Sequence, residues 1–288
     1  MKKLAICIPT YNRSKLLDRL LRSIPSSSKI VVSICDDGSD DETFKIINNH
    51  RKRLSIKYSY QKNQGRASAL RKSILNVKAQ FMLMMGDDDY FTKGGIKTII
   101  HNIEKNKNIK FFVFSTKIKD KKGSSSESLE NIPKINYLSL RNDFKIKRDL
   151  KEVIEHKLIS KIMYPEPKNI RRIPTGYLLF RISEKVDCLP VKSSPVIVIN
   201  YFSDGMSANV LSLKINYPSY MVKMYEIAIK NKKFESLTYR LKYIILFYRY
   251  SFHNRSLKLK NIKDFPLFIL GIFFALYDLM RIYIFHKK

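Results

Sequence analysis

Short apolar runs alternate with amphipathic segments over the first 116 residues of the chain. The runs end in turn residues, as buried strands do, and the segments between them repeat apolar residues at helical spacing. The expected strands are residues 3–8, 30–35, 56–61, 81–85 and 110–116. The expected helices are residues 14–24, a segment that ends near 50, 67–77 and 95–106. This alternation predicts an α/β fold with a mostly parallel sheet and helices on both faces.

The pattern becomes less regular after residue 116. Residues 117–133 are polar, with Lys-Lys-Gly-Ser-Ser-Ser near their centre, and predict an exposed loop. Residues 136–165 are expected to be helical, and Gly176–Arg181 is expected to form a strand. Between these two elements lies an irregular basic segment bracketed by prolines at positions 165, 167 and 174.

The C-terminal part is more apolar and more densely basic. Residues 221–288 carry 14 Lys or Arg against 4 Asp or Glu. Residues 265–285 are almost continuously hydrophobic and about as long as a membrane span, although Asp278 and Arg281 interrupt them. Because basic residues flank this run on both sides, the pattern favours a helix lying on an anionic membrane. A buried soluble helix and a spanning helix are the alternatives.

Composition limits the class of protein. The chain has 288 residues, of which 44% are hydrophobic, and this excludes a disordered chain. Cys7, Cys35 and Cys188 are too few for a disulfide framework, and we expect buried thiols in a reducing compartment. The formal net charge of +30 calls for an anionic partner, and nucleic acid, an anionic membrane and a phosphorylated substrate all meet that requirement.

Polar motifs follow three of the expected strands. These motifs are Pro9-Thr10-Tyr11-Asn12-Arg13, Asp36-Asp37-Gly38-Ser39 and Asp87-Asp88-Asp89. Each motif alone also fits a capping turn or a solvated loop. In a parallel α/β sheet, however, ligands bind beyond the carboxyl ends of the strands. Clustered carboxylates usually hold a cation, and hard oxygen ligands select Mg²⁺ or Mn²⁺.

Together with Asn63-Gln64-Gly65 and with Gly86, these motifs resemble the family 2 glycosyltransferases, which have the GT-A fold. The resemblance is strong over residues 1–115 and weak over 165–215. It implies an inverting transfer of a sugar from a nucleotide-diphosphate sugar. The domain organisation that follows is a GT-A domain over 1–220, with a nucleotide-sugar half (1–115) and an acceptor half (116–220), and a helical, membrane-associated extension over 221–288.

The resemblance also implies which residues bind the nucleotide. Pro9 and Tyr11 match the lining of the nucleotide pocket, and Asp37 matches the acid that binds the base, usually uracil. The family's third motif departs here, so that Arg66 or Arg71 is left as the residue facing the diphosphate. Either arginine equally fits a helix surface.

The Gly86-Asp87-Asp88-Asp89 segment lies over the family's Asp-x-Asp-Asp motif. The resemblance therefore makes Asp88 the ligand of a divalent metal, Mn²⁺ or Mg²⁺, and Asp89 its support. Asp87 falls on the variable position and is expected to reach the ribose. Gly86 replaces the first acid of the family motif, and this removes one expected donor contact.

The family takes its general base from an acid in the C-terminal half. Asp204 is the best-placed acid downstream of residues 176–181, and its alternative role is a turn before Gly205. A metal must offset the charge of the leaving nucleoside diphosphate, while a carboxylate takes the proton from the acceptor hydroxyl.

The expected partners follow from this interpretation. The resemblance implies a nucleotide-sugar donor, which is expected to be a UDP-sugar. It implies an acceptor that is a glycan or a lipid-linked molecule, as in bacterial surface polysaccharide assembly. The short N-terminal apolar run is below signal-peptide length, so we expect a cytoplasmic protein peripheral to the membrane. The alternatives are a nucleic-acid-binding protein with this fold, a nucleotidyltransferase and an inactive scaffold. No nucleic-acid recognition motif and no Gly-rich phosphate loop is found.

Overall fold

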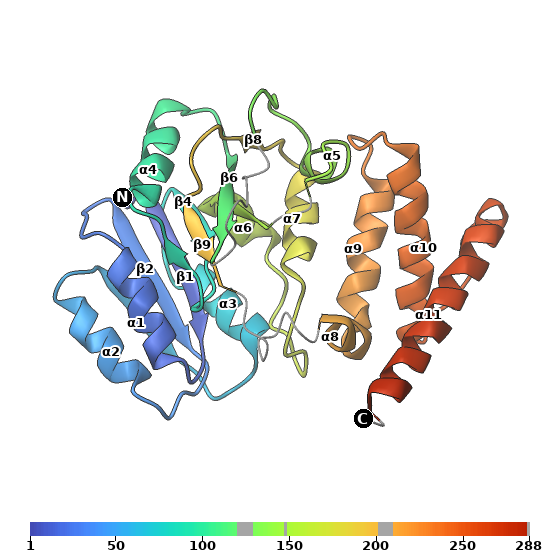
Figure 1. Cartoon of the computed structure of the whole chain (residues 1–288), viewed down its shortest axis with the longest axis horizontal. Coiled ribbons are helices and arrows are strands. Elements are labelled where there is room, and N and C mark those ends of the chain that lie inside the picture. The colour runs from blue at the N-terminus through green and yellow to red at the C-terminus, as the bar shows by residue number, and fades with distance from the viewer. Residues whose placement is uncertain (120–128, 147–148, 201–209, 287–288) are drawn as a thin grey trace. The chain divides into compact units, whose positions relative to one another are not determined.

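The computed structural model describes residues 1–119, 129–146, 149–200 and 210–286. The chain divides into two compact units. Unit 1 comprises Met1–Ile135, Ile146–Arg171 and Val186–Tyr201, and unit 2 comprises Asn136–Lys145, Arg172–Lys185 and Phe202–Lys288. The sheet belongs to unit 1, and unit 2 is helical (Figure 1).

Unit 1 is organised around a mixed sheet. Its strands are β1 (Leu4–Thr10), β2 (Ile30–Asp36), β3 (Ile56–Tyr60), β4 (Phe81–Met84), β5 (Tyr90–Phe91), β6 (Phe111–Ile118), β7 (Leu150–Glu155), β8 (Leu189–Pro190) and β9 (Ile197–Ile199). Their order is β3-β2-β1-β4-β7-β6-β9-β5, with β8 paired to β6. The pairs within β3-β2-β1-β4 are parallel, and β7 runs antiparallel to both of its neighbours.

Helices cover both faces of this sheet, as the sequence predicts. They are α1 (Ser14–Ser23), α2 (Thr43–Arg51), α3 (Arg66–Leu75), α4 (Gly95–Lys105) and α6 (His156–Ile162). Because side chains alternate along a strand, Ile6 shares a fully buried core with residues of α1 and α4. On the opposite face α3 packs against β1 and β2, where Ser33 donates a 2.6 Å hydrogen bond to the Ser73 carbonyl.

The prediction of a helix across 136–165 is wrong for residues 150–155, which form β7. Among the described residues of that range, helices are found only at α5 (Tyr137–Asn142) and α6. The Lys and Glu residues of β7 favour a helix in isolation. However, β4 and β6 offer backbone hydrogen bonds on both sides, and Leu150, Val153 and Ile154 are buried there. Tertiary pairing therefore overrides local propensity.

The expected strand at Gly176–Arg181 is also wrong, because this segment lies in helix α7 (Thr175–Ser183). Pro174 precedes the helix, and the buried residues Leu178, Leu179 and Ile182 recur at helical spacing. The Tyr177 ring meets Tyr220 edge-on within unit 2, at 5.0 Å between centroids. The short apolar run thus packs as one face of a helix.

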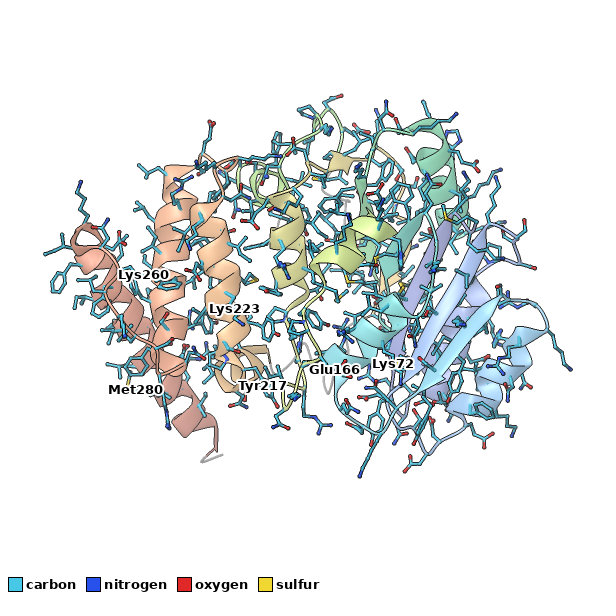
Figure 2. All side chains as sticks on the ribbon, turned by 180° about the vertical axis from the view of Figure 1, so that it is seen from behind. Lys72, Glu166, Tyr217, Lys223, Lys260 and Met280 are labelled. Atoms are coloured by element: carbon cyan, nitrogen blue, oxygen red, sulfur yellow. The ribbon has the colours of Figure 1, made fainter. Side chains whose placement is uncertain are left out.

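The remaining elements of unit 2 confirm the expected C-terminal helical extension. They are α8 (Val210–Asn216), α9 (Pro218–Lys230), α10 (Leu237–His253), the 3₁₀ turn η1 (Ile262–Asp264) and α11 (Phe265–His286). Helix α10 packs against both α9 and α11. The ring of Tyr225 stacks on those of Tyr243 and Tyr250, each 5.8 Å away. Figure 2 labels Lys223 on α9 and Met280 on α11.

The three cysteines are free and buried, as expected for structural thiols. Burial raises the pKa of Cys35 to about 11, and burial also raises the pKa values of Cys7 and Cys188. Most of the loop expected at 117–133 lies outside the described residues, and β6 extends to Ile118 at its start.

Candidate functional site

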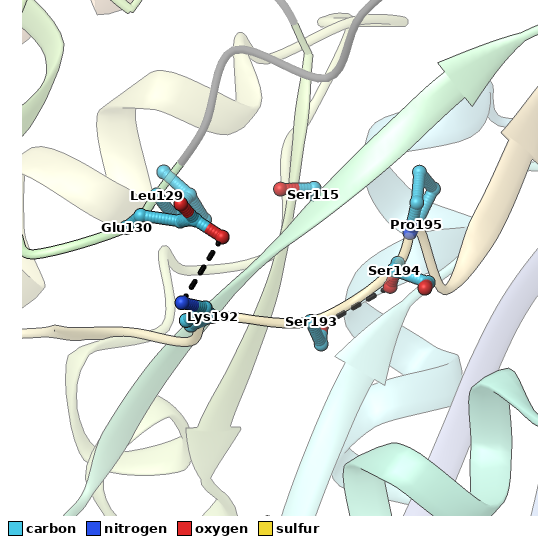
Figure 3. Close-up of a pocket in the computed structure, with 7 residues that line it drawn as sticks. All are labelled: Ser115, Leu129, Glu130, Lys192, Ser193, Ser194 and Pro195. Atoms are coloured by element: carbon cyan, nitrogen blue, oxygen red, sulfur yellow. Dashed lines mark hydrogen bonds and ion pairs between the residues drawn. The ribbon is translucent and has the colours of Figure 1, made fainter.

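A pocket of about 420 Å³ lies beside β6 in unit 1. Its wall includes Ser115, Leu129 and residues 192–195, and Lys192 pairs with Glu130 at 3.3 Å (Figure 3). Of the site residues expected from the sequence, those that the structure describes do not line this pocket. The chemistry of the site must therefore be sought at the strand ends.

The polar motifs meet at one edge of the parallel part of the sheet. Thr10 ends β1 in register with Asp36, which ends β2. On the other side of β1, Cys7 lies in register with Met84, the last residue of β4, so that the Asp87–Asp89 segment emerges beside the end of β1. The Thr10 hydroxyl donates to Asp87 at 2.9 Å and joins the first motif to the third. Sequence order at the strand ends was sufficient to predict this grouping.

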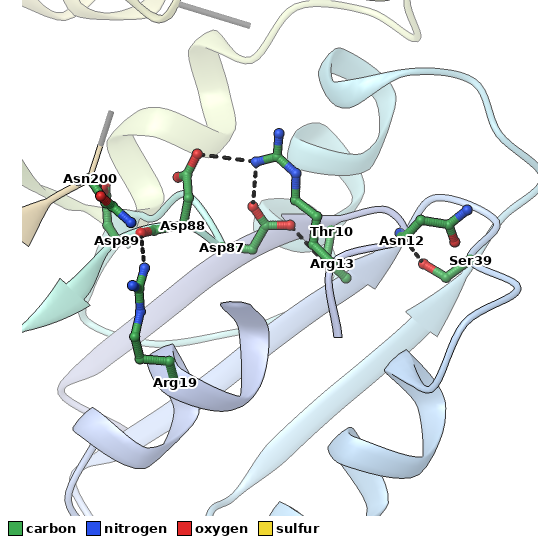
Figure 4. A network of polar contacts seen from close by, with 9 residues as sticks. All are labelled: Thr10, Asn12, Arg13, Arg19, Ser39, Asp87, Asp88, Asp89 and Asn200. Carbon is green, nitrogen blue, oxygen red and sulfur yellow. Dashed lines mark hydrogen bonds and ion pairs between the residues drawn. The ribbon is translucent and has the colours of Figure 1, made fainter. Parts of the chain in front are cut away.

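Asp87 is buried and held by two donors (Figure 4). Beside the Thr10 hydroxyl, Arg13 Nη1 lies 3.3 Å from Asp87 Oδ1, and the same nitrogen lies 3.1 Å from Asp88 Oδ2. Burial raises the pKa of Asp87 to about 6, although the neighbouring Arg13 acts in the opposite direction. Arg13 thus supplies positive charge to two of the three aspartates.

Asp88 is the most accessible of the three aspartates, with 29% of its side chain exposed against 9% for Asp87 and 13% for Asp89. Arg19 donates a 2.5 Å hydrogen bond to its backbone carbonyl. A Cβ at position 86 would lie 2.6 Å from Asp88 Oδ1. A side chain at position 86 would therefore require the Asp88 carboxylate to shift.

Asp89 faces away from Arg13 toward residues that follow much later in the chain. The Asn200 backbone N–H donates to Asp89 Oδ1 at 3.3 Å, and Lys151 Nζ lies 3.8 Å from Oδ2. Burial raises the pKa of Asp89, and the Lys151 charge lowers it again. β7 and the end of β9 thus contribute to the same cluster.

The fit of a divalent cation to these residues depends on Asp88. Among the described residues, no group of three or more His, Cys, Asp or Glu side chains is arranged to hold a metal ion. The carboxylates of Asp87 and Asp89 already contact basic side chains and hydrogen-bond donors of the protein itself. Mg²⁺ and Mn²⁺ sites commonly need only one or two carboxylates when substrate phosphates and water complete the shell. Asp88 meets that requirement.

Asp37 is buried and accepts hydrogen bonds at both carboxylate oxygens. Gln61 Nε2 and the Gln64 N–H donate to Oδ1 at 2.8 and 2.9 Å, and the Gly65 N–H donates to Oδ2 at 2.8 Å. Gly65 has φ of +94°, a conformation that favours glycine, and this turn directs α3 away from the sheet edge. Asp37 therefore fixes the shape of the turn at residues 61–65, and its expected role in binding the base stays a prediction.

Pro9 is buried in β1, and Tyr11 is half-exposed directly after that strand. Asn12 takes φ of +50°, and its backbone N–H donates to Ser39 Oγ at 3.0 Å. The first and second motifs are thus joined as well, and Tyr11 stands at the open side of this junction.

The two arginines considered for the diphosphate differ in their surroundings. Arg71 donates to Glu166 at 2.8 Å and to the Tyr164 carbonyl at 3.0 Å, so its guanidinium is committed to the segment after α6. Arg66 begins α3 directly after Gly65 and is half-buried. Arg66 remains the candidate of the two.

Asp204, the expected general base, lies outside the described residues. Sequence reasoning did not assign roles to Arg13, Arg19, Lys151 or Asn200, which supply the cations and N–H donors around the aspartates. Arg13 was visible in the first motif. Lys151 carried no local signal, because its segment was expected to be helical.

A mixed sheet that gathers aspartates beyond the carboxyl ends of its parallel strands places a ligand-binding site at that edge. The Glycosyl transferase family 2 model matches residues 5–164, more than half of the chain. The chain therefore belongs to glycosyltransferase family 2, as the motifs indicated.

Relatives share only parts of their length with this chain. Poly(ribitol-phosphate) beta-N-acetylglucosaminyltransferase TarS of Staphylococcus aureus is 31% identical over 103 residues, which span 34% of this chain and 18% of TarS. The UDP-Glc:alpha-D-GlcNAc-diphosphoundecaprenol beta-1,3-glucosyltransferase WfaP of Escherichia coli is 30% identical over 141 residues, or 48% of this chain and 55% of WfaP. GalNAc(5)-diNAcBac-PP-undecaprenol beta-1,3-glucosyltransferase of Campylobacter jejuni is 29% identical over 105 residues, covering 35% and 34%.

Solved structures confirm the fold. S. aureus TarS 1–349 in complex with UDP-GlcNAc superposes with a TM-score of 0.66 at 14% identity, over 93% of this chain and 79% of that one. The mannosyltransferase PcManGT of Pyrobaculum calidifontis, in complex with GDP-Man and Mn²⁺, gives a TM-score of 0.53 at 13% identity, over 98% and 82%. The expected GT-A α/β architecture is therefore correct.

Proposed function

We propose that this protein transfers a sugar, with inversion, from a nucleotide-diphosphate sugar to a hydroxyl group of a glycan or lipid-linked acceptor. The observation that carries the proposal is the Thr10–Asp87–Arg13–Asp88 cluster beyond the ends of β1 and β4. Its carboxylates and guanidinium suit a diphosphate that arrives with a cation. Membership of family 2 supports the proposal.

The donor's nucleotide is assigned to the edge formed by the first two motifs. Pro9 and Tyr11 are assigned to the nucleotide, and Asp37, whose carboxylate is held by three donors, is assigned to its base. Asp87 reaches the ribose, and Arg66 faces the diphosphate. A uridine nucleotide is favoured, because TarS was crystallised with UDP-GlcNAc and WfaP is named for UDP-Glc.

Asp88 is assigned as the ligand of Mn²⁺ or Mg²⁺, with Asp89 supporting it. When bound, the cation offsets the negative charge that develops on the leaving diphosphate. Arg13 must release Asp88 for this, and its guanidinium then becomes available to a donor phosphate oxygen, since arginine binds phosphates well. The Mn²⁺ in the PcManGT complex supports the assignment by analogy.

Asp204 is assigned as the general base. Its carboxylate takes the proton of the acceptor hydroxyl while that oxygen attacks the anomeric carbon and the bond to the diphosphate breaks. Asn200, four positions earlier in the sequence, donates its N–H to Asp89, and this supports the assignment. An attack from the face opposite the leaving group inverts the sugar carbon.

The acceptor class rests on the relatives. The Campylobacter and E. coli enzymes are named for undecaprenol-diphosphate-linked acceptors, and TarS for poly(ribitol-phosphate). Such acceptors fit a protein at the cytoplasmic face of the membrane and a role in surface polysaccharide synthesis. The nucleic-acid-binding alternative has no support from the family or the relatives, so the charge of +30 is assigned to anionic substrates and membrane.

The test is calorimetric titration of the purified chain with UDP, GDP and CDP, in Mn²⁺ and then in EDTA. We expect one nucleoside diphosphate to bind, and binding to weaken at least tenfold when the metal is removed. Asp88→Asn should abolish this metal dependence, whereas Asp143→Asn, which alters an exposed aspartate of unit 2, should not.

Asp204→Asn should leave nucleotide binding intact and abolish sugar transfer, measured as release of nucleoside diphosphate in the presence of acceptor. A chain that binds none of the three diphosphates, with or without metal, would contradict the proposed function.

A further inference from the structure

The C-terminal helix α11 exposes most of its apolar side chains. It is long and apolar enough to cross a membrane, yet only 17% of its most apolar window is buried within the structure. The exposed large hydrophobic residues are Phe265, Ile269, Leu270, Phe273, Phe274, Leu276, Tyr277, Leu279 and Met280. Figure 2 shows the side chains along this helix, with Met280 labelled. In water, so large an exposed apolar surface is unfavourable.

The exposed residues surround the helix rather than forming one face. With about 100° between successive residues, they span roughly 220° of the circumference. The buried residues Gly271, Ala275 and Asp278 form a narrow stripe on the remaining side. A protein partner would cover one face of such a helix, whereas an apolar solvent contacts all of its exposed sides. The distribution therefore favours lipid over a second protein chain.

The polar interactions of α11 point inward. Asp278 is fully buried and forms a two-point ion pair with Arg249 of α10, one contact of which is 2.7 Å. His253 Nε2 lies 3.1 Å from the same carboxylate. A helix with apolar side chains outside and its carboxylate paired inside has the arrangement found for polar residues in membranes. Gly271 lets the helix approach α10 closely, because a Cβ there would lie 2.6 Å from Tyr248 Cβ.

Basic residues lie at both ends of the apolar segment. Lys258 and Lys263 are exposed before it, and Arg281 is exposed near its C-terminal end. Lys260 is also exposed, and it pairs with Glu226 at 2.8 Å. Positive charge at both ends suits a helix parallel to an anionic surface, with each end at the level of the headgroups.

We propose that α11 lies in the boundary between headgroups and acyl chains of an anionic bilayer, with its exposed apolar sides in lipid and its Gly271–Asp278 stripe on α10. This proposal does not depend on the transfer reaction, since nucleotide binding by unit 1 is measured separately.

The absence of tryptophan from the chain provides a direct probe. Phe273→Trp introduces a single indole on the exposed side of α11, and Leu237→Trp introduces one at an exposed position at the start of α10. We expect vesicles with about one third phosphatidylglycerol to shift the emission of the indole at 273 to shorter wavelength. Brominated acyl chains should quench that indole and leave the indole at 237 unchanged.

Paired substitutions test the same surface by vesicle flotation. Leu276→Glu with Met280→Glu should reduce binding at least tenfold, because both carboxylates would enter the lipid boundary. The matched control is Leu237→Glu with Leu241→Glu, which changes two exposed leucines of α10 and should float like the original chain. Lys258→Gln and Lys263→Gln should each weaken binding to anionic vesicles by roughly fivefold and binding to neutral vesicles little.

Unchanged flotation of the Leu276→Glu/Met280→Glu chain would overturn the proposal. A vesicle-independent dimer, seen by light scattering and abolished by the same substitutions, would overturn it in favour of a second copy of the chain. UDP titration of each variant separates these outcomes from the proposed function, because nucleotide binding is assigned to unit 1. Far-UV circular dichroism of each variant checks that the helices of unit 2 are retained.

Discussion

At the scale of single residues, the aspartate cluster is balanced by the chain's own cations. Arg13 contacts both Asp87 and Asp88, and Lys151 faces Asp89. The cluster therefore needs no bound cation to be tolerated in the folded chain. A metal that binds Asp88 must compete with Arg13.

We predict that Arg13→Gln increases the affinity for Mn²⁺ in the absence of nucleotide by about fivefold, the effect of a partly exposed ion pair of ~1 kcal/mol. Arg22→Gln is the control, because Arg22 pairs with Asp18 on the surface of α1 instead. Calorimetry with Mn²⁺ alone provides the measurement. Equal or weaker affinity after the Arg13 substitution would show that the guanidinium does not compete for Asp88.

A second residue-scale prediction concerns Asp18, which joins α1 to α2. Burial acts to raise the pKa of Asp18, but hydrogen bonds from His50 at 2.7 Å and Arg22 outweigh it and lower the pKa. A carboxyl whose pKa is lower in the folded chain stabilises that state above its unfolded pKa, near 3.9, and loses this effect as pH falls through the folded pKa. Asp18→Asn should therefore destabilise the protein at pH 7 and have progressively less effect below pH 4.

Urea unfolding of the original protein and of the Asp18→Asn variant between pH 3 and 7 measures the difference in their unfolding free energies. A destabilisation that stays constant over the whole range would mean that packing, and not the charge of Asp18, accounts for the loss.

The same scale shows where sequence reasoning reaches its limit. Asp37 and Asp87–Asp89 could be grouped from sequence alone, because parallel strands end at the same edge. Lys151 could not, because its position depends on β7 pairing with β4, and nothing local encodes that contact. From the sequence, Gly86 could be identified only as the replacement of an acid, and its closeness to the Asp88 carboxylate required the structure.

At the scale of elements, the alternation of strands and helices was predictable through β6, where periodicity and local propensity agree. The errors fall on β7 and α7. β7 has helix-forming residues placed between two strands, and α7 is a short apolar run whose period is ambiguous. In both segments the neighbouring elements determine the structure: β7 pairs with β4 and β6, and α7 packs against α9.

The contact between α10 and α11 gives the element-scale prediction. Asp278→Leu would leave Arg249 and His253 without their buried carboxylate and should cost about 3 kcal/mol of unfolding free energy. Adding Arg249→Met should recover part of that loss, because no unpaired guanidinium then remains. Urea unfolding in the absence of vesicles is the measurement. A double variant less stable than Asp278→Leu alone would contradict the ion-pair interpretation.

At the scale of the whole molecule, the two units carry different tasks in the proposals above. The residues assigned to the donor lie in unit 1, and the proposed lipid contact lies in unit 2. A ligand stabilises the part that binds it, by about 2.7 kcal/mol at a hundred times its Kd.

We therefore predict that UDP with Mn²⁺ slows amide hydrogen exchange around residues 9–13, 37, 61–66 and 86–89 and leaves α9–α11 unchanged. Exchange measured by mass spectrometry tests this directly, and anionic vesicles should give the complementary pattern. Protection of α9–α11 by the nucleotide alone would show that the two units respond together.

The late position of β7 in the sequence also affects how the chain folds while it is being synthesised. β4 receives its antiparallel neighbour from residues that begin 66 positions after its own last residue, at Leu150. At ~5–20 residues per second, a ribosome leaves that apolar strand edge without its neighbour for roughly 3–13 s. An uncovered edge invites pairing with another nascent chain. The yield of folded protein in the cell should therefore depend on the rate of translation. It should also depend on chaperones that cover β4 until β7, the strand that carries Lys151, has been synthesised.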